Sequence, residues 1–383
     1  MKTGWTERPL SEVVMSRPGN NKIIKGKQSD QPGEGLVQAY SASGPDVWVT
    51  TADYKQPGVV ISAVGARCGK TFIADGEWTA IANTHVLLPG KEVDGRWLWY
   101  RTNDESFWIK GGAAQPFVKV KDTLQQLCKF PPLAEQRRIV GILDEAFEGL
   151  ATAKANAEQN LQNARALFES HLQAVFTQRG DGWVEKPLET VAAILNGYAF
   201  KSTDFSPKVG AKCIKITNVG VREFVCEADS YLPNSFASIY DAVSVKSGSI
   251  VLALTRTIIA GGLKVAVVPD EFDGALLNQR VASIIADHKH LNGAFLFLYL
   301  STQSVVEYVK ERVNTLMQPN LSITDLRSMP IPVPPLRKQD EITEQLDGLR
   351  EETQRLESLY QRRLTSLDEL KKSLLHRAFS GQL

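Results

Sequence analysis

The loop GARCGKT, residues 65–71, is the stretch of the sequence that looks most like a phosphate-binding element. A P-loop places four residues between its first glycine and the Gly-Lys-Thr triplet, and it holds phosphate at the start of a helix. Here three residues separate Gly65 from Gly69, and the segment that follows, TFIADGEW, is typical of a strand. The sequence therefore predicts no nucleoside triphosphate site in this loop.

Other spacings that support catalysis or metal binding are also missing from the sequence. No G-x-G-x-x-G motif opens a strand-helix-strand unit, and no grouping of serine, histidine and aspartate has a nucleophile elbow. The histidines are scattered, and the DHKH stretch at 287–290 has no nearby cysteine pair, so it is typical of a solvated turn. We therefore expect no metal site and no catalytic residues in this chain.

Composition places the chain among ordinary globular proteins. It has 383 residues, 43% of them hydrophobic and 23% charged, with a net charge of +1, so any basic surface must be local. No apolar run reaches the length of a membrane span, and no signal-peptide core follows Met1. The four cysteines lack C-x-x-C spacing, which predicts free thiols in a reducing compartment. We expect the protein to be cytoplasmic.

The sequence segments on either side of the glycine loops occur twice in the chain. FPPLAEQRRIVGILD at 130–144 matches VPPLRKQDEITEQLD at 333–347, which lies 203 positions later. WTERPLSEVV at 5–14 matches WVEKPLETVA at 183–192 at an offset of 178, so the second copy holds about 25 extra residues. A repeat of this length predicts two copies of one domain that begin and end alike and differ in the middle.

After each Pro-Pro-Leu comes a long stretch with apolar residues at alternating steps of three and four. This spacing, sustained over about five heptads, indicates a coiled-coil seam. The expected seam positions are Ile139, Leu143, Leu150 and Leu161 in the first stretch and Ile342, Leu346, Leu349, Leu356, Leu367 and Leu374 in the second. In the first stretch the pattern continues through His171 and Val175. We predict that the two helices pack antiparallel within one chain; packing of each helix on its own domain, or in a homodimer, stays open.

The bodies that precede the helices alternate short strand-like segments with glycine turns, and helical stretches close each body. This mixture predicts the α+β class. The predicted architecture is two globular domains joined by two long antiparallel coiled-coil helices, as an internal repeat with a pseudo-twofold axis. The predicted boundaries are a first domain at 1–130, a central helix at 131–180, a second domain at 181–333 and a distal helix at 334–383.

Together these features resemble one family, the specificity subunits of Type I restriction-modification systems. The residues that carry the resemblance are PPLAEQRRI and PPLRKQDEI at the starts of the helices, QPN at 318–320 and the C-terminal HRAFSGQL. The resemblance spans essentially the whole chain, although Arg337-Lys338 stands where the first copy has Ala134-Glu135. Members of the family have two target-recognition domains, each followed by a helical region, which agrees with the predicted fold.

The resemblance implies a DNA-recognition subunit without catalytic activity of its own. Each domain would recognise one half of a split, asymmetric sequence in double-stranded DNA, and the antiparallel helices would set the unread spacer. The repeated scaffold would dock two modification subunits, which methylate adenine, and restriction subunits with ATP-dependent activity would complete the assembly. The chain itself would bind no cofactor; S-adenosylmethionine, ATP and magnesium would belong to the partner subunits.

Within this resemblance, polar residues around the glycine loops become candidates for DNA contacts. Arginine and lysine suit guanine edges, asparagine and glutamine suit adenine, and phosphate contacts only position a domain. The candidates are Arg67, Lys70, Asn83 and His85 in the first domain and Arg256, Thr257, Lys264, Asn278, Gln279 and Arg280 in the second. Each of them, taken singly, is equally compatible with a solvated turn.

The stretch NGYAFK at 196–201 offers a candidate of a different kind. Tyr198 could pack against a sugar or a groove wall beside Lys201. The pair that Tyr198 forms with Phe200 is nevertheless more typical of a core than of an interface.

Two other interpretations of the whole chain stay open. A coiled-coil scaffold whose two domains bind protein or carbohydrate would show the same repeat, and salt-dependent DNA binding would distinguish it from a DNA reader. A specificity chain of a methylation-only or Type IIB-like system would show the same motifs. An enzyme in its own right is not supported, because the motifs for catalysis are missing.

Overall fold

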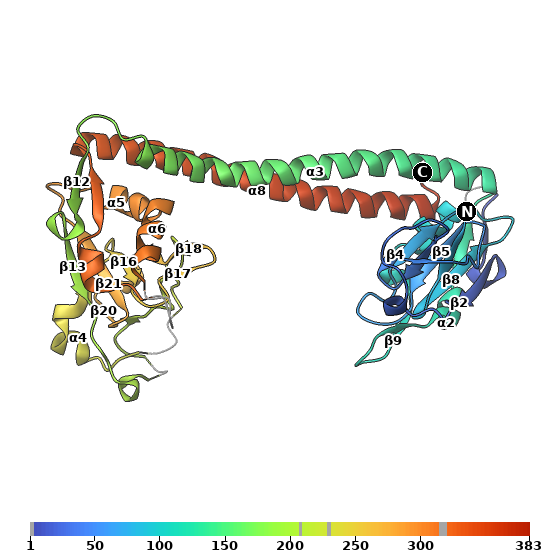
Figure 1. The fold of residues 1–383 in the computed structure, drawn as a ribbon, viewed down its shortest axis with the longest axis horizontal. Coiled ribbons are helices and arrows are strands. Elements are labelled where there is room, and N and C mark those ends of the chain that lie inside the picture. The colour runs from blue at the N-terminus through green and yellow to red at the C-terminus, as the bar shows by residue number, and fades with distance from the viewer. Residues whose placement is uncertain (1–3, 207–208, 228–230, 314–319) are drawn as a thin grey trace. The chain divides into compact units, whose positions relative to one another are not determined.

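The computed structural model describes residues 4–206, 209–227, 231–313 and 320–383. Contacts divide the chain into two compact units: unit 1 comprises Met1–Gln159 with Gln361–Leu383, and unit 2 comprises Asn160–Tyr360. The two longest helices, α3 (Leu133–Thr177) and α8 (Leu336–Ser380), have 45 residues each and contribute a segment to both units (Figure 1). Each unit is therefore a globular domain together with two helix segments.

The domain of unit 1 is built on a four-stranded antiparallel sheet in the order β2-β8-β5-β6. Its strands are β2 (Val14–Pro18), β8 (Thr84–Pro89), β5 (Gly58–Ser62) and β6 (Thr71–Ala74). The other strands are β1 (Thr6–Pro9), β11 (Leu127–Phe130), β3 (Val37–Ser41), β4 (Gly44–Val49), β7 (Trp78–Ala80), β9 (Lys110–Gly111) and β10 (Phe117–Val118). The helices are α1 (Gly95–Thr102) and α2 (Val120–Leu124), with 3-10 turns at Leu10–Glu12, Lys25–Lys27 and Glu105–Phe107. Strand β5, GVVIS, is buried along its whole length, as its apolar run predicts.

The core of unit 1 joins the domain to both long helices. Trp97 of α1 is fully buried in one cluster with Ile139 of α3 and Ala378 of α8. Farther along the helices, Lys154 Nζ lies 3.0 Å from Asp368 Oδ1. The start of α3 and the end of α8 therefore run antiparallel within this unit.

The domain of unit 2 repeats this plan. Its four-stranded antiparallel sheet has the order β13-β21-β16-β19, and the pair β12-β22 stands where unit 1 has β1-β11. The strands are β12 (Val184–Pro187), β13 (Ala192–Asn196), β14 (Cys213–Ile214), β15 (Ser244–Val245), β16 (Ile250–Ala253), β17 (Ile258–Ile259), β18 (Gly262–Leu263), β19 (Val265–Val267), β20 (Ala275–Leu277), β21 (Val281–Ala286) and β22 (Pro330–Val333). The helices are α4 (Phe236–Ile239), α5 (Gly293–Leu300), α6 (Gln303–Arg312) and α7 (Ile323–Arg327), with 3-10 turns at Leu188–Thr190, Ser202–Asp204, Asp241–Val243 and Asp270–Phe272.

The two sheets correspond strand by strand. In chain order, β2, β5, β6 and β8 of unit 1 match β13, β16, β19 and β21 of unit 2, and α1 and α5 each follow the last strand and pack on the sheet. The largest difference in length lies between the first two of these strands, at residues 19–57 in unit 1 and 197–249 in unit 2. The internal repeat predicted from the sequence is therefore confirmed, and its divergent middle is the segment between these two strands.

The core of unit 2 also includes both long helices. Phe176 of α3 and Leu346 of α8 are buried with Phe295 of α5, an apolar helix that the core surrounds. Arg165 Nε lies 3.0 Å from Glu357 Oε2. The end of α3 and the start of α8 therefore run antiparallel here too, which supports pairing of the two helices within one chain.

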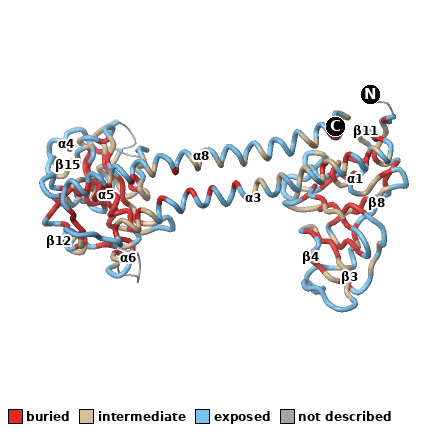
Figure 2. Tube along the Cα trace, turned by 90° about the horizontal axis from the view of Figure 1, so that it is seen from above, coloured by how far each residue is buried: buried red, intermediate tan, exposed pale blue. Residues whose placement is uncertain are grey.

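The seam residues of the long helices differ in burial. Those that are buried are Ile139, Leu143, Leu161, Ile342 and Leu346, and those that are half-buried are Leu150, Leu349, Leu356, Leu367 and Leu374 (Figure 2). Near the end of α3, His171 and Val175 are half-buried, and His171 Nε2 lies 3.2 Å from Gln345 Nε2 of α8. Leu172 and Phe176, which the seam pattern does not include, are buried as well. This part of α3 packs on α5 as well as on α8, and a helix that faces a globular core uses a wider stripe than a two-helix seam.

The remaining structural features concern thiols, metal ligands and membrane segments. The four cysteines are free, with Cys226 exposed and the other three buried. In the described ranges no group of three or more histidine, cysteine, aspartate or glutamate residues is arranged to hold a metal ion. Among the same residues no helix has the apolar length needed to cross a membrane.

Candidate nucleic-acid interface

Loops of unit 1 leave the four-stranded sheet together at one edge. Strands β2 and β5 end there and β8 begins there, because Pro18 pairs with His85 and Ser62 pairs with Thr84. We call this surface loop edge 1 and define it as residues 19–22, 63–70 and 81–83. The backbone nitrogen of Ala63 donates to the carbonyl of Asn83 at 2.9 Å, which fastens two of the loops to each other.

The glycine loop at this edge presents its two cations to solvent. Gly65 and Gly69 have φ angles of 101° and 93°, in the region that favours glycine. The turn closes through Lys70 N, which donates to Arg67 O at 3.1 Å, and both side chains are exposed. A strand, β6, follows the loop, so no helix N-terminus is present here to hold phosphate. Arg67 and Lys70 are thus free to meet a ligand from solvent.

Asn83 and His85 occupy different environments. Asn83 is exposed, with φ of 65°, a left-handed conformation that asparagine adopts more readily than most residues. His85 is half-buried on β8, its Nε2 lies 2.5 Å from Ser16 Oγ, and burial lowers the pKa of its imidazole below the usual value. His85 is therefore held in the sheet beside Ser16, and Asn83 is the member of this pair that faces solvent.

Unit 2 has the equivalent arrangement. Strands β13 and β16 end and β21 begins at one edge of its sheet. We call this surface loop edge 2 and define it as residues 197–201, 254–257 and 278–280. Leu254 N donates to Arg280 O at 2.8 Å, at the position where Ala63 N donates to Asn83 O in unit 1. The same backbone hydrogen bond therefore holds both edges.

A glycine opens each loop edge for a steric reason. A Cβ on Gly19 would lie 2.2 Å from the carbonyl oxygen of Ile81, and a Cβ on Gly197 would lie 2.1 Å from that of Asn278. Both distances are far below van der Waals contact, so only glycine allows the backbones to approach this closely. The two edges thus share backbone geometry.

The aromatic pair of loop edge 2 is split between surface and core. Phe200 is only 8% exposed and belongs to a small core cluster. Tyr198 is 44% exposed, with its ring centroid 4.6 Å from that of Tyr240. Lys201 is exposed, and its backbone nitrogen donates to Asp204 Oδ2 at 2.9 Å. Tyr198 and Lys201 can therefore meet a ligand, whereas Phe200 is a core residue.

The loop at 254–257 contains one exposed cation and one buried hydroxyl. Arg256 is exposed, with φ of 50°. Thr257 has no exposed surface, so the expectation that its side chain touches a base is wrong. Lys264 is half-buried and its Nζ donates to Ile216 O; burial, and then the charge of Arg256, lower the pKa of this ammonium. The side chain of Lys264 therefore bonds inward to Ile216, whereas Arg256 faces solvent.

The third loop of this edge is fastened to the first. Gln279 N donates to Tyr198 O at 2.9 Å, and the half-buried Asn278 accepts at Oδ1 from Arg280 N at 3.3 Å. The side chains of Gln279 and Arg280 are exposed. Loop edge 2 thus presents Tyr198, Lys201, Arg256, Gln279 and Arg280, whereas loop edge 1 presents Arg67, Lys70 and Asn83.

The sequence analysis missed two residues near loop edge 2. One contacts the loop itself, and the other contacts strand β19 beside it. Asn320 is exposed and forms a bridge with Thr255; its sequence signal is the QPN stretch, of which Gln318 and Pro319 lie outside the described residues. Arg222 has φ of 60° and forms an ion pair with Glu169 of α3. No local pattern marks Arg222, because its partners are distant in sequence.

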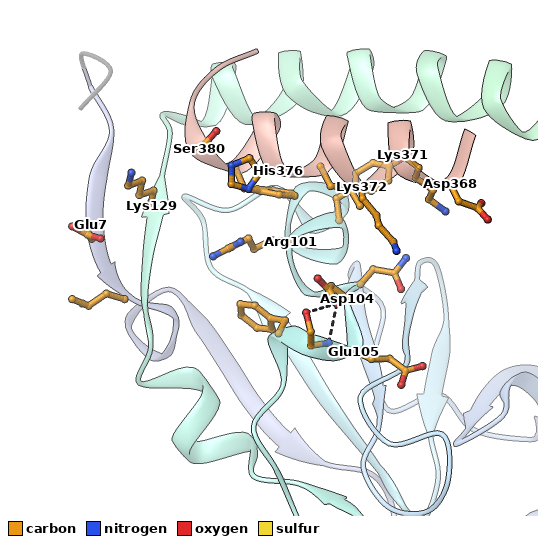
Figure 3. Close-up of a pocket in the computed structure, with 17 residues that line it drawn as sticks. Glu7, Arg101, Asp104, Glu105, Lys129, Asp368, Lys371, Lys372, His376 and Ser380 are labelled. Carbon is orange, nitrogen blue, oxygen red and sulfur yellow. Dashed lines mark hydrogen bonds between the residues drawn. The ribbon is translucent and has the colours of Figure 1, made fainter. Parts of the chain in front are cut away.

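A hollow of about 1090 Å³ lies in unit 1 between α1, the turn after it and the end of α8 (Figure 3). Its lining includes the cations Arg101, Lys129, Lys371 and Lys372, the carboxylates Glu7, Asp104, Glu105 and Asp368, and the imidazole of His376. Asp368 pairs with Lys154, and Glu105 with Lys110. Loop edge 1 stays the DNA candidate of this unit, because Arg67, Lys70 and Asn83 are exposed together on its loops.

A duplicated α+β domain with two long helices and matching loop edges defines the class of the protein. The model of the Type I restriction modification DNA specificity domain matches residues 2–162 and 180–362. The chain therefore belongs to the Type I restriction-modification specificity family, as its sequence resemblance predicts.

Relatives and solved structures agree with this assignment. The MjaVIII specificity subunit of Methanocaldococcus jannaschii is 28% identical over 340 residues, which cover 83% of this chain and 77% of that one. The EcoAI specificity subunit of Escherichia coli is 29% identical over 170 residues, 44% of this chain and 28% of that one. A chain from a structure of type I R-M complex assembly and conformational transition superposes with a TM-score of 0.76 at 16% identity, covering 100% and 99% of the two chains. The HsdS subunit of Thermoanaerobacter tengcongensis gives 0.64 at 18% identity, covering 100% and 98%. The predicted α+β repeat is confirmed.

Proposed function

We propose that this chain recognises a split, asymmetric sequence in double-stranded DNA, with one half-site bound at each loop edge. The observation that carries the proposal is that two edges with the same backbone hydrogen bonds expose different side chains. A common scaffold can place both edges in a groove, while different side chains at the base edges give different half-sites.

The chemistry of the exposed side chains supports DNA as the ligand. Arg67 and Lys70 in unit 1, and Lys201, Arg256 and Arg280 in unit 2, are exposed cations next to groups that read bases, such as Asn83 and Gln279. Cations contact phosphates and guanine, and amides pair with adenine. A protein-binding or carbohydrate-binding scaffold would not need this combination at both edges.

The same proposal assigns catalysis to partner chains. Two modification subunits dock on the repeated helical scaffold and transfer methyl groups from S-adenosylmethionine, and restriction subunits supply the activity that needs ATP and magnesium. The scaffold suits two copies of one partner because α3 and α8 start alike, at the leucine of a Pro-Pro-Leu, and have the same length. The proposed place of this assembly is the cytoplasm.

The test is to produce the chain together with the modification subunit of its own system and to map methylated adenines across a genome. The expected result is one sequence with two defined halves and a constant spacer. Methylation without a split motif would contradict the proposal, and methyl transfer by the purified chain alone would contradict its non-catalytic role. Adding restriction subunits and ATP, and measuring cleavage, distinguishes a complete system from a methylation-only one.

A salt series distinguishes DNA recognition from a scaffold role. Each phosphate contact releases a counterion, so the affinity of the assembled complex for DNA should fall steeply as salt rises. A scaffold for protein or carbohydrate would show no specific DNA binding at any salt concentration.

A further inference from the structure

Arg222 occupies a tight turn of unit 2 with an unusual backbone conformation. Its φ of 60° lies in the left-handed region. The turn is closed by Gly220 N, which donates to Glu223 O at 2.8 Å, and by a bridge between Val219 and Phe224. A non-glycine residue keeps such a conformation where surrounding contacts hold it in place.

The contacts of Arg222 join this turn to three other elements of unit 2. Its guanidinium contacts both carboxylate oxygens of Glu169 on α3, with Nη2 at 2.8 Å from Oε2. Nη2 also donates to the carbonyl of Ser301, at the end of α5, at 2.7 Å. The backbone nitrogen of Arg222 donates to Val265 O on β19 at 2.9 Å. One residue thus fastens the turn to a long helix, a short helix and an edge strand.

The chain segment that contains Arg222 also contacts Lys264, which is bonded to loop edge 2. Lys264, next to Val265, donates through Nζ to the carbonyl of Ile216. Lys264 N also donates to Thr257 O at 2.8 Å, directly beside Arg256. The segment 215–227 therefore lies between α3 and the loop that carries Arg256.

We propose that Arg222 is a positioning residue for base recognition by unit 2: its ion pair with Glu169 fixes segment 215–227 on α3, and this segment fixes Arg256 through Lys264. The inference rests on the proposed function, because it names what controls the geometry of loop edge 2.

The exposure of the ion pair separates positioning from simple stabilisation. The side chains of Arg222 and Glu169 are 28% and 53% exposed, and partly solvated ion pairs contribute little to the stability of a fold. Loss of the pair should therefore change the placement of Arg256 more than the melting temperature. In unit 1, Asp144 of α3 contacts Arg96 and Tyr100, which both belong to the short helix α1. These contacts do not involve loop edge 1. The effect should thus be confined to one half-site.

The experiment uses the complete complex with its modification subunits and compares four variants of the chain. Glu169→Gln removes one charge and leaves the turn intact. Arg222→Gly removes the guanidinium and relieves the left-handed backbone. The exchange of Glu169→Arg with Arg222→Glu restores the pair. Arg165→Ala is the matched control, because its ion pair with Glu357 lies one turn away on α3 and joins that helix to α8 without touching the turn that holds Arg222.

The measurement is the methylation rate on cognate DNA and on DNA with each single base change in either half-site. Glu169→Gln and Arg222→Gly should lower the preference for the cognate base about tenfold at one half-site, the one that Arg256→Ala affects, in line with loss of one good base contact. The exchanged pair should recover part of the preference, because it restores the ion pair but not the hydrogen bond to Ser301 O, and Arg165→Ala should keep all of it.

The remaining outcomes overturn the inference in distinguishable ways. Unchanged preference in both variants, or a lower melting temperature without a change in preference, would show that the pair only stabilises the fold. Equal loss at both half-sites would show a general effect on the complex. A wild-type complex that methylates no split target would contradict the proposed function itself, and the positioning role with it.

Discussion

Gln136 and Gln339 make the same three hydrogen bonds, each within its own unit. The amide nitrogen of each donates to two carbonyls, one in the Pro-Pro-Leu before the long helix and one shortly before the short helix, and the amide oxygen accepts from the residue that caps the short helix. The partners are Pro131, Glu92 and Asp94 for Gln136 and Pro334, His290 and Asn292 for Gln339, at 2.7 to 2.9 Å. Both glutamines are buried. The repeated glutamine is thus the joint between each long helix and its domain.

Replacing either glutamine should destabilise only the unit that contains it. Gln136→Ala or Gln339→Ala leaves buried backbone groups without partners, at a cost of about 1–3 kcal/mol in free energy of unfolding. Urea denaturation combined with hydrogen exchange, resolved by unit, measures the effect. Gln354→Ala, at an exposed position of α8, is the control and should change little. Equal destabilisation by all three variants would contradict the assigned role.

The seam of the long helices can be tested with two neighbouring leucines of α8. Leu356 is half-buried in the seam, whereas Leu359 is 49% exposed. Leu356→Asp places a charge between the helices and should cost a few kcal/mol, whereas Leu359→Asp should stay within about 0.5 kcal/mol. Thermal denaturation gives the comparison. Similar melting temperatures for both variants would place the seam elsewhere.

The half-buried imidazole of His85 predicts a pH dependence for unit 1. Burial lowers its pKa, so at acidic pH the unfolded chain, with a pKa of about 6.5, binds more protons than the folded protein. The free energy of unfolding should therefore fall as the pH drops through about 6.5, and this contribution should be fully present above that value. His85→Gln removes the titration and keeps a polar group near Ser16. The difference in unfolding free energy between wild type and variant should shrink from pH 8 to pH 5.5; a constant difference would contradict the assignment.

Arg256 should control one half-site. Arg256→Ala should weaken discrimination there by about 1–3 kcal/mol and leave the other half-site unchanged, because each unit has its own loop edge. Methylation of DNA with single base changes measures the effect. Lys246→Ala, an exposed lysine before the opposite end of β16, is the matched control and should preserve both half-sites. Equal relaxation at both halves would show that Arg256 contacts phosphate or only stabilises the loop.

The proposed role of the helices in setting the spacer is tested by lengthening both. The pair of Lys154 with Asp368 places Ala157 of α3 opposite the region of Leu364 in α8, so one heptad inserted after each keeps the seam in register. Seven residues add roughly 10 Å, or about three base pairs. Total methylation should fall, because three base pairs also rotate the duplex by roughly 100°. The sites that remain methylated should keep both half-sites and have a longer spacer; the original spacer in an active variant would contradict the role.

Sequence alone predicts those features whose signals are local. The seam around Leu143 follows from a repeated step of three and four residues, and the internal repeat follows from matching segments. The same rule does not predict the burial of Leu172 and Phe176, because the neighbouring helix α5 enters the contact and widens the buried stripe. The periodicity of one helix contains no information about a third element.

The candidate site shows the same limit. The sequence predicts Arg256 as a candidate because a cation beside a turn is a local pattern. In the structure Arg256 is exposed. The burial of Thr257 and the inward bond of Lys264 depend on how β16 and β19 pair, which neighbouring residues do not encode. The pairing of Arg222 with Glu169 joins residues 53 positions apart and needs the folded chain to be seen.

Unit 1 draws on both ends of the sequence, whereas unit 2 is one continuous stretch. Ala378, which is fully buried in the core of unit 1, is synthesised after every residue of unit 2. A growing polypeptide therefore completes its second domain first, which reverses the usual N-terminal-first order of folding on the ribosome. Until the last turns of α8 emerge, the part of this core that Ala378 covers stays open, and chaperone contacts with the nascent chain should concentrate there.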